Sequence, residues 1–139
     1  NMKKIILIVE DHTEEQVSAK QAVLESGNTA IVAGNLEDGT RLLKQLGDNL
    51  FGVITDLHYQ SRALSDTDAE KPNGLAIVAL CVEKGIRVGV CSDVNHHFSE
   101  YLKMPIQVLS SHQNYPFGKI PFSEDSKNWK KIVTQVINL

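Results

Sequence analysis

Short, uniformly apolar runs alternate along the chain with longer segments of helical spacing. Residues 5–9 are all aliphatic, a run too short for a typical helix and too uniformly apolar for a strand with one face in water. Short, mostly apolar segments at residues 29–33, 51–55 and 87–91 are also predicted as strands. Runs of this kind are typical of strands that helices cover on both faces. The pattern therefore predicts the strands of a parallel sheet.

A segment with helical spacing follows each of the first three predicted strands. After the third strand, a long polar stretch comes before the helical segment. Polar residues that can cap a helix stand before each segment, and a glycine stands after it. At the start of the first predicted helix, Thr13-Glu14-Glu15-Gln16 has the sequence of a capping box. The predicted starts and stops are Thr13 and Gly27, Asn35 and Gly47, and Asn73 and Gly85.

The last third of the chain has weaker patterns until its final helix. A short helix is predicted over residues 95–103, ended by Pro105, and a fifth strand is predicted near Lys119. The final helix is expected to follow a cap at Ser123 or Asp125. Its apolar stripe consists of Trp129, Ile132, Val133, Val136 and Ile137.

Five strand-then-helix units predict an α/β fold, a doubly wound five-stranded parallel sheet with right-handed crossovers. The chain has 139 residues, a size typical of one domain. Asn1 precedes Met2 and is set aside as a remnant of expression, so the single domain is expected over residues 2–139.

Charge and cysteine usage narrow the possible partners. The formal net charge is −3, so no basic field is available for a phosphate backbone, and no nucleic acid partner is expected. No apolar run approaches the ~20 residues that span a bilayer, so no membrane association is expected either. The two cysteines, Cys81 and Cys91, match neither a disulfide framework nor a metal motif, which predicts a cytoplasmic protein.

Polar residues follow the predicted strands at the edge where doubly wound sheets bind ligands. Glu10 and Asp11 follow the first strand, Asp56 the third, Ser92 the fourth, and Lys119 lies near the end of the fifth. Converging carboxylates repel each other unless a cation relieves them, and Mg²⁺ takes such ligands readily. A hydroxyl and a lysine opposite the carboxylates suit a phosphoryl group.

The sequence resembles the receiver domain of two-component response regulators over nearly its whole length. The matching segments are Ile6-Leu7-Ile8-Val9-Glu10-Asp11-His12, Val53-Ile54-Thr55-Asp56-Leu57, Asn73-Gly74-Leu75, Val90-Cys91-Ser92 and Lys119-Ile120-Pro121-Phe122. The resemblance implies the flavodoxin-like receiver fold. It also implies a stand-alone signalling domain rather than an enzyme.

The resemblance further implies a role for each site residue. Asp56 is expected to accept a phosphoryl group from a histidine kinase, phosphotransfer protein or small phosphodonor. Mg²⁺ is expected to bind Glu10, Asp11, Asp56 and the main-chain carbonyl of His58, while Ser92 acts as the switch hydroxyl and Lys119 pairs with the phosphate. The phosphorylated chain is expected to bind an unidentified downstream protein.

Two other functions stay open at this point. The chain could be a receiver-like interaction module that takes no phosphate. It could also be a Mg²⁺-dependent phosphotransferase or nuclease, although no second acid stands two residues after Asp56.

The connection between Asp56 and Gly74 is longer than is usual in that family and is mostly polar. Residues 58–72 contain few side chains that could anchor them to a core, so we expect the segment to be mobile. Because it starts two residues after Asp56, we also expect it to modulate access to the phosphate site.

Overall fold

The computed structural model describes residues 3–62, 71–92, 96–123 and 127–139. The strands are β1 (Ile5–Val9), β2 (Thr29–Ala33), β3 (Leu50–Thr55), β4 (Arg87–Cys91) and β5 (Phe122–Ser123). The helices are α1 (Thr13–Glu25), α2 (Leu36–Leu46), α3 (Gly74–Lys84), α4 (His96–Ser110) and α5 (Trp129–Ile137), with a 3-10 helix, η1 (Gly47–Asn49), before β3.

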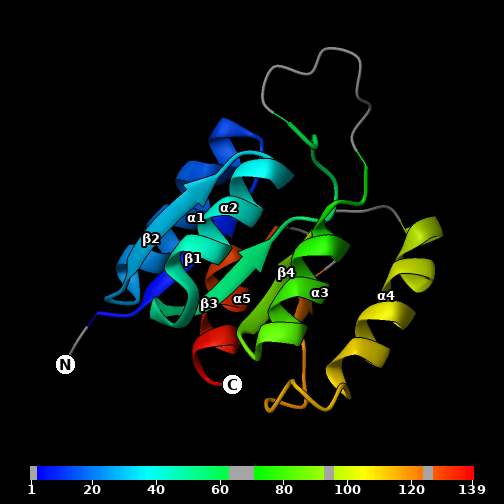
Figure 1. Cartoon of the computed structure of the whole chain (residues 1–139). Helices are drawn as coiled ribbons and strands as arrows, with labels where there is room; N and C mark the ends of the chain where they lie inside the picture. The colour runs from blue at the N-terminus through cyan, green and yellow to red at the C-terminus, as the bar shows by residue number, and fades with distance from the viewer. Residues whose placement is uncertain (1–2, 63–70, 93–95, 124–126) are drawn as a thin grey trace.

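The five strands form one parallel sheet in the order β2-β1-β3-β4-β5. Figure 1 shows β2, β1, β3 and β4 side by side in this order. Alternate residues of β1 are buried in different cores: Leu7 and Val9 face the side covered by α2, α3 and α4, and Ile6 and Ile8 face α1 and α5. The predicted α/β doubly wound sheet is therefore confirmed, and its two-sided burial explains the uniformly apolar runs.

The helix starts agree with the sequence patterns in part. Asn35 caps α2, since its side-chain oxygen accepts a hydrogen bond from the Asp38 amide at 2.8 Å. The capping box at Thr13 is wrong: Thr13 is the first residue of α1, and the preceding His12 makes no side-chain cap bond. Gln16 instead donates to the Glu10 carbonyl at 2.6 Å, so it joins α1 to the end of β1.

Helix α4 is longer than predicted because it continues through Pro105 to Ser110. A proline inside a helix removes one backbone hydrogen bond. Leu102 and Ile106 lie one turn apart and are 4% and 2% exposed in the core beneath α3. Their burial keeps the segment helical across the proline, so the predicted stop is wrong.

The approach to α5 also differs from the prediction. Ser123 belongs to β5, and Asp125 lies outside the described residues. The residue that caps α5 is Asn128, whose side chain accepts from the Lys131 amide at 3.1 Å. The predicted apolar stripe of α5 is confirmed, with Trp129, Ile132, Val133 and Val136 buried and Ile137 packed beside them.

The polar segment after β3 is anchored at its base, contrary to expectation. Tyr59 is fully buried and pairs with Lys71 in an isolated antiparallel bridge. The carbonyls of Gln60 and Ser61 accept hydrogen bonds from the first two amides of α2, at 3.1 and 2.9 Å. The expectation of mobility otherwise concerns residues 63–70, which lie outside the described part of the chain.

Both cysteines are free thiols buried in the core, and burial raises the pKa of each. Within the described ranges, no helix combines the length and the apolar character that crossing a bilayer requires.

Candidate functional site

The carboxyl ends of β1 and β3 lie side by side and place their next residues together. Val9 pairs with Thr55 in the parallel register. The Asp56 amide donates to the Val9 carbonyl at 2.9 Å, and the Glu10 amide donates to Ala33 of β2 at the same distance. Glu10 and Asp56 are thereby held by the sheet itself rather than by a free loop.

Glu10, Asp11 and Asp56 form an acidic cluster at this edge. Each offers a carboxylate oxygen, and these oxygens all lie within 4.8 Å of one another. Glu10 is fully buried and Asp56 is 4% exposed, whereas Asp11 is half-buried. The structure thus brings together the three carboxylates that were predicted to follow the first and third strands.

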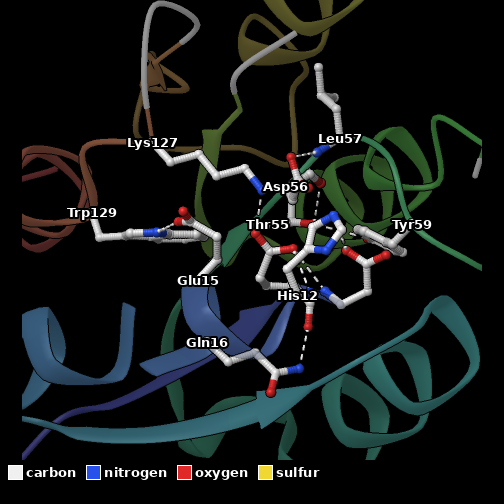
Figure 2. A network of polar contacts seen from close by, with 11 residues as sticks. His12, Glu15, Gln16, Thr55, Asp56, Leu57, Tyr59, Lys127 and Trp129 are labelled. Atoms are coloured by element: carbon white, nitrogen blue, oxygen red, sulfur yellow. Dashed lines mark hydrogen bonds and ion pairs between the residues drawn. The ribbon is translucent and has the colours of Figure 1, made fainter. Parts of the chain in front are cut away.

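A lysine that the sequence analysis missed bridges two of the carboxylates. The Lys127 ammonium donates to Glu10 Oε1 at 2.5 Å and to Asp56 Oδ2 at 3.1 Å (Figure 2). Its side chain is 7% exposed, so the bridge is largely shielded from water. Figure 2 shows the Lys127 side chain extending to Asp56, with its ammonium beside that residue.

The structure does not bring Lys119 to the acidic cluster. Lys119 is exposed and precedes β5, which begins at Phe122, so the predicted place of Lys119 near the end of the fifth strand is wrong. In a parallel sheet the residues before a strand lie at the edge opposite the carboxyl ends. Lys127 instead follows β5. Lys127 could have been found from the sequence only if the position of this two-residue strand had been predicted correctly.

The start of α5 holds Lys127 over the cluster. Trp129 is buried, and its indole N–H donates to Glu15 Oε2 of α1 at 2.6 Å. Because Lys127 lies only two residues before Trp129, this bond ties its backbone to the helix that follows Glu10 and Asp11 (Figure 2).

Burial and repulsion shift the ionisation of the cluster. Burial, assisted by the charge of Asp56 and a hydrogen bond with Asp11, raises the pKa of Glu10 from 4.5 to about 7, although Lys127 opposes the shift. Burial acts to lower the pKa of Lys127, but its bonds and ion pairs with Glu10 and Asp56 outweigh this and raise it. One ammonium, bonded to two of the three carboxylates, therefore leaves an excess of negative charge, and the site favours an additional proton or cation.

The Asp56 carboxylate is oriented by its own backbone. Its Oδ1 accepts from the Leu57 amide at 2.8 Å, while Oδ2 faces Lys127. The Gly74 amide donates to the Leu57 carbonyl at 2.9 Å. A Cβ at Gly74 would lie 2.8 Å from the Leu57 Cα and still closer to the Asp56 carbonyl, so this close approach of α3 requires glycine.

Ser92 and His58 lie on segments beside the cluster. Ser92 directly follows β4, is fully buried, and donates its amide to the Ser123 carbonyl at 2.8 Å. His58 is half-buried, two residues after Asp56.

The acidic cluster fits a hard divalent cation. Asp11 Oδ1 is buried and accepts no hydrogen bond from the described residues, and His12 Nε2 lies 3.7 Å from it. Carboxylate oxygens are the ligands that Mg²⁺ prefers, and the excess of negative charge would be relieved by it. Glu10, Asp11 and Asp56 are the residues that would hold the ion.

Comparison with protein-family models finds no match, and neither does comparison with curated protein sequences. Solved structures do match. A response regulator receiver protein from Pseudomonas putida has a TM-score of 0.68 and 16% identity, covering 99% of this chain and 98% of that one. A receiver domain protein from Clostridium thermocellum has a TM-score of 0.69 and 14% identity, covering 97% and 91%.

A third match is the response regulator TrrA from Thermotoga maritima in complex with Mg²⁺-BeF, with a TM-score of 0.63, 18% identity and 97% coverage of both chains. The chain therefore has the CheY-like response-regulator receiver fold.

Proposed function

We propose that this chain is a response-regulator receiver that accepts a phosphoryl group on Asp56 in a Mg²⁺-dependent reaction. The donor would be a phosphohistidine of a histidine kinase or phosphotransfer protein, or a small phosphodonor. The observation that carries the proposal is the buried Asp56 carboxylate, bridged by Lys127 to Glu10 within a cluster of three acids. The receiver fold around the cluster supports it.

In the proposed reaction, an Asp56 carboxylate oxygen attacks the phosphorus of the donor. A P–O bond forms and the bond from phosphorus to the donor nitrogen or oxygen breaks, so the leaving group keeps that electron pair. The Leu57 amide fixes the orientation of the carboxylate, and the Lys127 ammonium offsets negative charge on the transferred oxygens. We assign to Lys127 the role that the resemblance implied for Lys119.

Bound Mg²⁺ would neutralise charge on the phosphoryl oxygens and align them. Asp11 and Asp56 would bind it, with the main-chain carbonyl of His58 and with Glu10 directly or through water. Calorimetric titration should detect Mg²⁺ binding in the wild type and lose it in the Asp11→Ala, Asp56→Ala double variant. Unchanged affinity in that variant would overturn the assignment.

Ser92 would carry the signal away from the site. Its buried position after β4 and its link to Ser123 support a role for its hydroxyl in binding the new phosphoryl group. Such a bond would pull the end of β4 toward the acceptor. Amide spectra with the phosphate mimic beryllofluoride should change around Ser92, and less so in Ser92→Ala. Identical spectra with and without the mimic would argue against the switch.

The central test is intact-mass analysis after incubation with acetyl phosphate and Mg²⁺. We expect one added phosphoryl group in the wild type and none in Asp56→Asn. Lys127→Gln should react far more slowly, whereas Lys119→Gln, a matched change at an exposed lysine, should react normally. A folded wild type that takes no phosphate would refute the proposal and favour the receiver-like interaction module.

A further inference from the structure

Tyr59 is a fully buried tyrosine beside the site, and the role proposed above does not use it. Its hydroxyl lies 2.9 Å from Thr55 Oγ1, and Thr55 Oγ1 lies 2.7 Å from the Asp56 carbonyl oxygen. A carbonyl can only accept, so the Thr55 hydroxyl must donate to it. The single proton of Thr55 is thus used, and Tyr59 is the donor to Thr55.

This chain of hydrogen bonds ends on the peptide group that orients the acceptor. The Asp56 carbonyl and the Leu57 amide belong to the same peptide plane. The carbonyl receives the Thr55 hydroxyl, and the amide donates to Asp56 Oδ1. Hydrogen bonds in series polarise one another, and fixing the carbonyl of a planar group also fixes the direction of its N–H.

The tyrosine is itself held from several sides. Its amide donates to the Lys71 carbonyl at 3.2 Å, and its carbonyl accepts from Asn73 Nδ2 at 2.8 Å. Its ring belongs to the core cluster that also contains Leu57 and Ile77. Burial is the main cause that raises the pKa of Tyr59, and the charge of Asp56 adds to it, so the hydroxyl keeps its proton at physiological pH.

We propose that Tyr59 is a positioning residue for phosphoryl transfer, acting through Thr55 and the 56–57 peptide to aim the Asp56 carboxylate. This inference rests on the proposed function of Asp56. The segment after β3 thereby supplies one residue to the machinery of the site. In the same segment, the carbonyls of Gln60 and Ser61 accept hydrogen bonds from the first two amides of α2.

The test compares Tyr59→Phe with Tyr115→Phe. Tyr115 is also a buried tyrosine, and its hydroxyl donates to the Lys119 carbonyl at 2.9 Å, away from Asp56. Both variants lose one buried hydroxyl, so a purely structural effect would appear in both. We expect Tyr59→Phe to lower the maximal phosphorylation rate with acetyl phosphate about tenfold, with little change in the half-saturating donor concentration. Tyr115→Phe should leave both parameters unchanged.

Substitutions at Thr55 test whether the effect of Tyr59 passes through the Thr55 hydroxyl. Thr55→Val should slow the reaction as Tyr59→Phe does, Thr55→Ser should restore it, and the Tyr59→Phe, Thr55→Val double variant should be no slower than either single one. Additive losses, or equal rates in Tyr59→Phe and the wild type, would overturn the inference.

A second measurement does not depend on phosphorylation. The amide proton of Leu57 reports the bond to Asp56 Oδ1 directly, and its chemical shift should move in Tyr59→Phe but not in Tyr115→Phe. An unmoved shift would refute the positioning role. If the shift moves while the wild type takes no phosphate, the proposed function fails but the hydrogen-bond chain to Asp56 is upheld.

Discussion

Replacing Glu10 by glutamine should change how the stability of the protein depends on pH. Glu10 is fully buried, 2.5 Å from Lys127 and close to two other carboxylates. Its pKa is raised from 4.5 to about 7, chiefly by burial. A folded-state pKa above the unfolded value means that the folded state binds the proton more tightly. Glu10 therefore contributes most stability when protonated, below about pH 4.5, and that contribution is lost as pH rises through about 7.

The size of the effect follows from the two pKa values. At pH 5.5 Glu10 is protonated in the folded state and mostly ionised in the unfolded one, whereas at pH 8 it is ionised in both. Integrating the difference in bound protons gives a loss of about 2 kcal/mol of unfolding free energy between these pH values. The raised pKa of Lys127 does not alter this slope, because the ammonium stays protonated in both states over the range.

Urea denaturation at pH 5.5 and pH 8, with EDTA to remove divalent cations, measures this difference. Trp129 is the single tryptophan and is buried, so its fluorescence reports unfolding. The free energy of unfolding of the wild type relative to Glu10→Gln should fall by about 2 kcal/mol from the lower to the higher pH. Glu14→Gln, at an exposed position in α1, should keep the slope of the wild type. Parallel pH profiles for the wild type and Glu10→Gln would refute the reasoning.

Two further substitutions test how the fold supports the site. Val133→Asp should lower the free energy of unfolding by about 3 kcal/mol or more, because it buries an unpaired charge under the sheet. Thr134→Asp, at the next and exposed position, should lower it little. Equal shifts of the melting temperature in the two variants would contradict the packing of α5. Gly74→Ala should both destabilise the chain and slow phosphorylation, since the added methyl group meets the backbone of Leu57 at 2.8 Å, while Gly34→Ala, with its nearest neighbour at 3.6 Å, serves as the control. A Gly74→Ala variant that melts and reacts like the wild type would show that α3 can move away without consequence.

Much of the fold was predictable because burial on both faces leaves a local signature. A strand covered on two sides is apolar along most of its length. The runs of β1, β2 and β4 are apolar throughout or after a first polar residue, which is why these strands were predicted with their observed bounds. Strand β5 has two residues and no such run, so it was predicted too early in the chain. The course of α4 through Pro105 was also missed, because core contacts of Leu102 and Ile106 outweigh the local preference for a stop.

Part of the candidate site could likewise be predicted from local sequence patterns, and part depends on the tertiary structure. The convergence of Glu10, Asp11 and Asp56 could be predicted from the local pattern alone, because residues that follow parallel strands emerge at one edge of the sheet whatever the loops do. The lysine that joins them could not be predicted locally, since Lys127 contacts Glu10 and Asp56 across 117 and 71 residues of chain and is placed there by the packing of α5. The buried path from Tyr59 to the Asp56 carboxylate is equally beyond a local pattern, because it depends on how one side chain turns back into the core after the strand ends.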